Sequence, residues 1–198
     1  MSQRGEVIIE GRYATLKYER RLAHPREVVW KAITDPRELA LWFNNKAVIN
    51  GRNGGTIDFV TGPAGFHTTG RILVWDPPRV FEHEWHTAPH PQLPKGEAEA
   101  VIRWELVRDG DSTTILTLTF SRLTKPTALG FAPGMHAFLD RLEATLKETL
   151  CQIGCCDMMQ SSRSILPSMQ NDFITVSTGF LLHPSRHDTI YSDSSRMM

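Results

Sequence analysis

Residues 20–43 read RRLAHPREVVWKAITDPRELALWF, and this stretch says most about the fold. It predicts a strand that runs into His24-Pro25, an amphipathic helix, and a shorter helix that starts after a break at Asp35-Pro36 and ends in Trp42-Phe43. Pro25 suits the first turn of the first helix. The apolar residues that follow recur at helical spacing: Val28, Val29, Ala32 and Ile33. Together with a late helix and the strands between them, this stretch predicts a sheet wrapped around one long helix.

Alternation of apolar and polar residues predicts seven strands. They cover about 12–22, 46–50, 55–60, 66–75, 79–86, 98–108 and 113–121. The three prolines of 87–97 predict a loop. Period-two alternation assigns one set of side chains to the inner face of the sheet: Leu16, Tyr18, Ile72, Val74, Phe81, His83, Trp85, Ile102, Trp104, Leu116 and Leu118.

A long helix is expected over 133–150, with Pro133 in its first turn. Its apolar residues share one face: Met135, Phe138, Leu139, Leu142 and Leu146. Antiparallel strands with one apolar and one polar face are typical of a sheet covered on one side only. The fold class is therefore α+β, with about seven antiparallel strands around the helix.

Several short motifs between about residues 10 and 148 fit a known family. They are AHPREVVW (23–30), TDP (34–36), WF (42–43), GRILVWDPP (70–78), the strand of Trp85, DGDSTTILTL (109–118) and GMHAFLDRL (134–142). By these motifs the chain resembles the START-like superfamily, also called SRPBCC or helix-grip, and within it the branch of the activator of the heat-shock-protein-90 ATPase. The resemblance implies a helix-grip fold with a cavity. Its members include lipid and hormone carriers, polyketide cyclases and co-chaperones, and they share no catalytic motif. Met135 stands where that family pattern leads us to expect Trp.

The composition changes after residue 150. Residues 151–198 contain no Lys, Glu or Trp, but they hold all three cysteines, five of the seven methionines and many serines. We therefore expect a START-like domain over 1–150 and a Cys/Met/Ser-rich extension over 151–198. The extension is predicted to be weakly structured or a small appendage, without a part in the core function.

Overall composition argues against several classes of protein. Lys plus Arg and Asp plus Glu both number 22, so the formal net charge is zero, whereas nucleic-acid binders carry a basic patch. No apolar run approaches the roughly 20 residues that span a bilayer. The charged N-terminus does not resemble a signal peptide, and the default expectation is a cytoplasmic protein with reduced thiols. No cofactor is expected, because Gly51–Gly55 lacks the Lys-Ser/Thr ending of a phosphate loop.

Candidate polar groups for a cavity are few. His83 lies in the inward register, where a histidine either bonds a ligand, acts as an acid or base, or is satisfied by a neighbouring group. Tyr18 and Thr68 are further candidates, and inward Arg20 needs an anion, with a protein carboxylate favoured. Arg103 falls in the outward register. His136 flanks the apolar stripe of the last helix, where it either lines the rim of the cavity or is exposed, and the exposed position is favoured. No metal site is expected, because His83 and His86 point to opposite faces of a strand.

The leading hypothesis is binding of a small hydrophobic, aromatic or lipid-like molecule between the long helix and the sheet. Its predicted contacts are Tyr18, Ile72, Val74, Phe81, His83, Trp85, Ile102, Trp104, Met135, Phe138, Leu139 and Leu142. One alternative is a cyclase or dehydratase that uses His83. Another, by family analogy only, is a co-chaperone that stimulates a chaperone ATPase.

Overall fold

The computed structural model describes residues 5–161. Over this range the chain forms a sheet of eight strands and three helices. In chain order the elements are β1 (Glu6–Glu10), β2 (Tyr13–Leu22), α1 (Arg26–Thr34), α2 (Pro36–Trp42), β3 (Asn44–Ile49), β4 (Thr56–Thr61), β5 (Phe66–Asp76), β6 (Val80–Thr87), β7 (Glu97–Arg108), β8 (Thr114–Thr124) and α3 (Lys125–Ser161).

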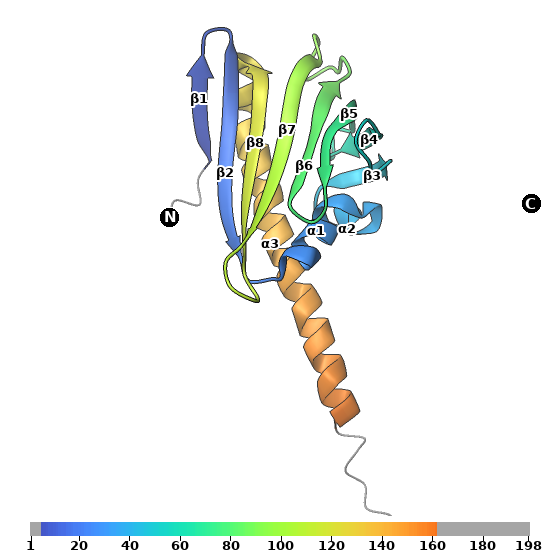
Figure 1. The fold of residues 1–198 in the computed structure, drawn as a ribbon. Coiled ribbons are helices and arrows are strands. Elements are labelled where there is room, and N and C mark those ends of the chain that lie inside the picture. The colour runs from blue at the N-terminus through green and yellow to red at the C-terminus, as the bar shows by residue number, and fades with distance from the viewer. Residues whose placement is uncertain (1–4, 162–198) are drawn as a thin grey trace, which may run out of the picture.

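The sheet is antiparallel throughout, with the strand order β1-β2-β8-β7-β6-β5-β4-β3. Figure 1 shows α3 crossing behind the central strands, with α1 and α2 beside it and the end of α3 projecting past the sheet. The α+β helix-grip architecture predicted from the sequence is confirmed. None of the helices in the described part of the chain is both long and apolar enough to cross a membrane.

The strand count differs from the prediction because β1 was missed. Its residues, EVIIE, place three apolar side chains in succession between two glutamates, so no alternation marks them as a strand. The strand forms because it pairs with β2 at the edge of the sheet, where Glu6 lies opposite Lys17 and Ile8 lies opposite Thr15.

The long helix also begins earlier than predicted, at Lys125, so Pro133 lies inside it. The expected start followed from Pro133, because proline is favoured in the first turn of a helix and disfavoured in its interior. The true start has its own sequence signal, since Thr124 is a favoured capping residue and Pro126 falls in the first turn. At the other end the backbone stays helical to Ser161, past the expected boundary at residue 150. The rest of the predicted extension, 162–198, lies outside the described residues.

The inner face of the sheet follows the predicted alternation with one break. Ile72 pairs with His83, but the register then shifts, so that Val74 pairs with Glu82 and Trp75 with Phe81. Because directly opposite residues share a face, Val74 is turned to the outer face with Glu82, and Trp75 takes the inner position. The expectation that Val74 faces inward was wrong, since a β-bulge inverts the alternation beyond it.

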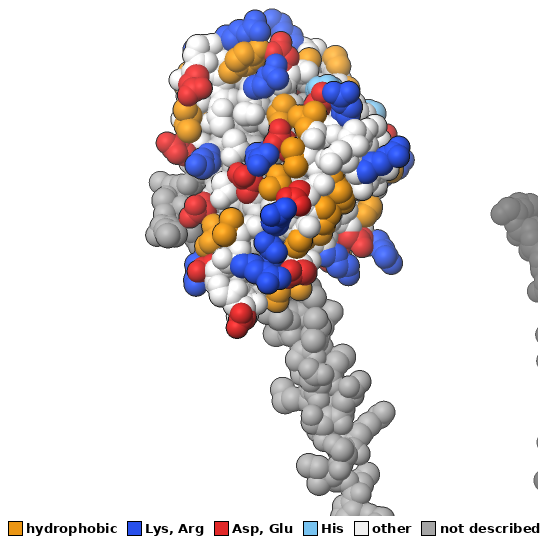
Figure 2. All heavy atoms as spheres, in the orientation of Figure 1, with side chains coloured by type: hydrophobic (Ala, Val, Ile, Leu, Met, Phe, Trp, Pro, Cys, Tyr) orange, Lys and Arg blue, Asp and Glu red, His pale blue; other side chains and the backbone are white. Residues whose placement is uncertain are grey.

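The outer face of the sheet carries charges of both signs, which lie interspersed on the side turned to the viewer in Figure 2. Arg103 lies on this face, where Nη2 donates to Glu105 Oε1 at 2.9 Å and Nη1 contacts Glu82. Arg103 therefore points away from the interior, as its register predicts.

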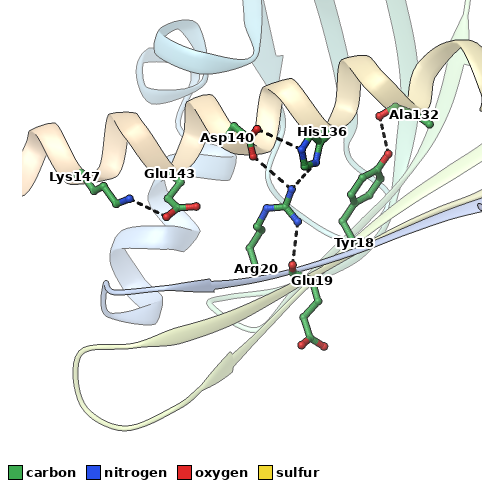
Figure 3. Close-up of polar contacts among 8 residues, drawn as sticks. All are labelled: Tyr18, Glu19, Arg20, Ala132, His136, Asp140, Glu143 and Lys147. Carbon is green, nitrogen blue, oxygen red and sulfur yellow. Dashed lines mark hydrogen bonds and ion pairs between the residues drawn. The ribbon is translucent and has the colours of Figure 1, made fainter. Parts of the chain in front are cut away.

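Polar contacts join residues 132–140 of α3 to β2 (Figure 3). The Tyr18 hydroxyl donates to the Ala132 carbonyl at 2.8 Å. Buried Arg20 donates from Nη2 to His136 Nδ1 at 2.8 Å and pairs with Asp140 at 3.5 Å. Arginine only donates, so Nδ1 of His136 is an acceptor in this arrangement. The prediction that a protein carboxylate pairs with Arg20 is confirmed by Asp140, and His136 is a second partner of the guanidinium group.

Candidate ligand-binding cavity

A cavity of about 280 Å³ lies between the first half of α3 and the β4–β6 end of the sheet. Its walls come from the end of α2, from β4, β5, β6 and β8, from two loops and from α3. The lining residues are Phe43, Thr61, Gly62, Pro63, Ala64, Phe66, Thr68, Trp85, Thr87, Gln92, Phe120, Gly130, Phe131, Gly134, Met135 and Phe138.

Two exposed glycines of α3 lie at the mouth of the cavity. Gly130 and Gly134 are four residues apart and therefore lie on the same side of the helix. A Cβ atom added at either position would meet no atom within 4 Å. The same two glycines weaken the helix by about 1 kcal/mol each relative to alanine. Both glycines are exposed, so a side chain at either position would extend into open space beside the cavity.

Aromatic rings form most of the wall. Trp85 lies 5.8 Å from Phe43 and 5.7 Å from Phe120, measured between ring centroids. Phe138 meets Phe43 edge to face at 5.0 Å. Edge-to-face and tilted contacts at these distances stabilise the rings against each other. They hold flat apolar surfaces around the space.

The polar groups of the wall are uncharged. Thr68 and Thr87 face each other across β5 and β6, with their hydroxyl oxygens 3.3 Å apart. Both side chains are buried, at 1% and 4% exposure. Thr61 and Gln92 complete the polar part of the lining.

His90 joins the two loops at the rim of the cavity. The Gln92 backbone N–H donates to His90 Nδ1 at 3.2 Å, and His90 Nε2 lies 3.1 Å from the Ala64 carbonyl oxygen. Nδ1 therefore accepts, and the proton on Nε2 is donated to Ala64. The ring also lies 4.5 Å from that of Phe66. His90 thus ties the loop after β4 to the loop after β6.

Three of the residues predicted to contact a ligand line this cavity: Trp85, Met135 and Phe138. Thr68, also considered from the sequence, lines it as well. Most of the others are buried in the packed core: Tyr18, Ile72, Phe81, His83, Ile102, Trp104, Leu139 and Leu142. Within the part of the chain that the structure describes, none of these eight residues lines the cavity.

Sequence reasoning missed a second group of lining residues. Gly130 and Phe131 were overlooked because the helix was expected to start after them. Thr87 ends β6 in the inward register of Phe81 and Trp85, so alternation would have found it if the strand had been extended by one residue. Gln92 lies in a loop, for which no periodic signal exists.

His83 is buried at 1% exposure. Its Nδ1 lies 2.9 Å from the Glu84 carbonyl oxygen, to which it donates, and its ring packs 4.6 Å from Phe81. Burial lowers the pKa of His83 from 6.5 to about 4. The residue is therefore a neutral core histidine at pH 7, and the geometry does not bring it to the cavity as an acid or base.

No group of three or more His, Cys, Asp or Glu side chains within the part of the chain that the structure describes is arranged to hold a metal ion. His83 faces the core, whereas His86 lies on the outer face, 4.0 Å from Glu84. The opposite orientations follow from the strand alternation.

Comparison with known proteins agrees with this architecture. The family described as Activator of Hsp90 ATPase homolog 1-like protein matches residues 23–147. A sheet wrapped around a long helix defines the helix-grip class, and the chain belongs to this family within it. No curated protein matches the chain.

Solved structures show the same fold at low sequence identity. CalU16 from Micromonospora echinospora is 24% identical, with a TM-score of 0.54 over 71% of this chain and 78% of that one. MLL2253 from Mesorhizobium loti is 22% identical, with a TM-score of 0.59 over 68% of this chain and 98% of its own. NE0264 from Nitrosomonas europaea is 23% identical, with a TM-score of 0.56 over 72% and 99%.

Proposed function

We propose that this protein binds a small, uncharged and largely apolar molecule in the cavity beside α3. The observation that carries the proposal is a space of about 280 Å³ whose lining includes six aromatic side chains. Concave apolar sites with a few polar groups are the usual form of small-molecule sites. Burial of apolar ligand surface supplies the affinity.

The volume favours a compact aromatic ligand over a lipid. A dry apolar cavity of about 150 Å³ is enough to bind benzene, and drug-sized ligands occupy roughly 300–1,000 Å³. A space of about 280 Å³ therefore suits a molecule of two fused rings. Its flat faces match the walls formed by Trp85 and Phe120.

The ligand is expected to be uncharged. The described residues of the lining include no Lys, Arg, Asp or Glu. Moving a charged group out of water without a partner costs many kcal/mol, so a carboxylate or an amine would bind poorly here.

The test fills the mouth of the cavity without disturbing the core. Gly134→Leu adds a side chain where a Cβ meets no atom within 4 Å, and helical side chains lean toward the N-terminal turn, here over Gly130. The matched control is Ala137→Leu, at an exposed position of the same helix outside the lining. Binding of indane, a neutral bicyclic hydrocarbon, is measured by isothermal titration calorimetry and ligand-observed NMR.

We expect indane to bind the unchanged protein and the Ala137→Leu variant alike. Gly134→Leu should weaken binding by at least about tenfold, the cost of losing roughly 1.4 kcal/mol of binding free energy. Its thermal midpoint should not fall, because leucine is a better helix residue than glycine. Absence of binding to the unchanged protein, or equal binding by both variants, would refute the proposal.

The two alternatives considered from the sequence stay predictions. A cyclase or dehydratase using His83 lacks support from geometry, since this histidine is packed in the core. The family description names an activator of a chaperone ATPase, and a chaperone partner for this chain rests on that description alone. A pull-down with an ATPase assay tests it.

A further inference from the structure

A row of buried polar residues crosses the sheet, and two of its three members line the cavity. Thr68 of β5 lies opposite Thr87 of β6, and Thr87 lies opposite Glu97 of β7. Directly opposite residues share a face, so all three turn inward, and all are buried. Polar side chains on a buried face need partners. Their hydrogen bonds can therefore be followed one by one.

The carboxylate of Glu97 is already hydrogen-bonded to the last residue of β8. Its Oε2 accepts from the backbone N–H and from the hydroxyl of Thr124, each at 3.2 Å. The two remaining hydroxyls, of Thr68 and Thr87, lie 3.3 Å apart and are each other's partners. Among the described residues, no other side-chain hydrogen bond is made by either of them.

The two hydroxyls carry one proton more than their mutual bond uses. Each threonine hydroxyl has one proton to donate and can accept two bonds. Whichever hydroxyl donates to the other, the accepting one keeps its own proton. Both residues line the cavity. The pair therefore offers one unused donor at a wall that is mostly apolar.

We propose that the Thr68–Thr87 pair selects ligands with an uncharged acceptor oxygen, such as a ketone, aldehyde, ether or phenol, over hydrocarbons of the same shape. This inference rests on the proposed function, since it concerns the same cavity. An acceptor oxygen on the ligand accepts a hydrogen bond from the unused hydroxyl, whereas a hydrocarbon leaves that hydroxyl without an acceptor. The preference comes from this penalty as much as from the bond itself.

The experiment compares 1-indanone with indane, which have the same bicyclic frame and differ by one carbonyl. Dissociation constants are measured by calorimetry for the unchanged protein and for the double variant Thr68→Val/Thr87→Val, in which methyl groups replace both hydroxyls. The control is Thr69→Val, on the same strand but exposed on the outer face. The ratio of the two dissociation constants is compared between proteins, because the different hydration of the two compounds cancels in that comparison.

The unchanged protein and Thr69→Val should prefer 1-indanone by the same ratio, and the double variant should lower that ratio by about tenfold, the size of one hydrogen bond. A second measurement needs no variant: the infrared carbonyl band of bound 1-indanone should lie at lower wavenumber than in hexane. An unchanged ratio in the folded double variant, or a bound carbonyl band at its hexane position, overturns the inference. If indane binds in these cases, the proposed function stands; if indane does not bind the unchanged protein, the proposed function itself fails.

Discussion

Replacing His83 by phenylalanine should change how the stability of this protein depends on pH. His83 is buried among rings, 4.6 Å from Phe81 and 6.0 Å from Phe59, so a phenyl ring fits its surroundings in size and polarity. The substitution removes the donation from Nδ1 to the Glu84 carbonyl, which costs about 1 kcal/mol at neutral pH. It also removes an ionisable group.

The ionisable group decides the result at low pH. Burial lowers the pKa of His83 to about 4 in the folded protein, from 6.5. Between these values the unfolded chain binds a proton that the folded protein does not, so the free energy of unfolding falls as the pH falls. The loss begins near pH 6.5 and reaches about 3 kcal/mol at pH 4, since one pKa unit corresponds to about 1.4 kcal/mol.

His83→Phe should therefore be less stable than the unchanged protein by about 1 kcal/mol at pH 7 and more stable by about 2 kcal/mol at pH 4. Urea denaturation followed by circular dichroism at half-unit steps measures the difference, in which the titration of other groups cancels. Phe81→Leu is the control, because it opens a small cavity in the same core and should lower stability by a similar amount at every pH. A pH-independent difference between His83→Phe and the unchanged protein would refute the reasoning.

Three further outcomes follow from named contacts. His136→Leu removes an acceptor of buried Arg20 and should lower the free energy of unfolding by about 2 kcal/mol in urea titrations; no change would mean that Asp140 satisfies the arginine alone. Gly51→Ala places a Cβ within 2.5 Å of the Trp75 ring and should cost about 1–3 kcal/mol by thermal unfolding, whereas an unchanged melting temperature would show that the ring moves freely. Truncation after Leu150 should leave indane binding and stability within about 1 kcal/mol of the full chain, and collapse of the domain would show that the extension is integral.

The succession of elements was largely predictable from local pattern. Pro25 and Asp35 mark the starts of α1 and α2, and the structure shows why: Asp35 Oδ1 accepts the Arg37 N–H at 2.8 Å as a helix cap. Alternation identified seven of the eight strands, because burial of one face imposes a period of two on the residue types. The eighth, β1, is held by pairing with β2 and carries no such pattern.

The bulge in β5 shows the limit of that pattern. Val74 and Trp75 are both acceptable on either face, so nothing in the sequence reveals that the alternation inverts between Ile72 and Val74. The register with β6 decides it, by placing Trp75 beside Phe81. Register is a property of two strands and is set by their packing.

The sequence by itself determined that the protein wraps a one-sided sheet around a long helix, because amphipathic periodicity records which side of each element leaves water. It could not locate the cavity, since a residue that packs against a neighbour and one that faces empty space can occupy the same inward position in the alternation. His83 and Thr68 illustrate this: both were expected inside, yet His83 is packed among rings whereas Thr68 lines the space. Only the tertiary structure separates them, because the cavity is bounded by residues that α3, four strands and two loops bring together from distant parts of the chain.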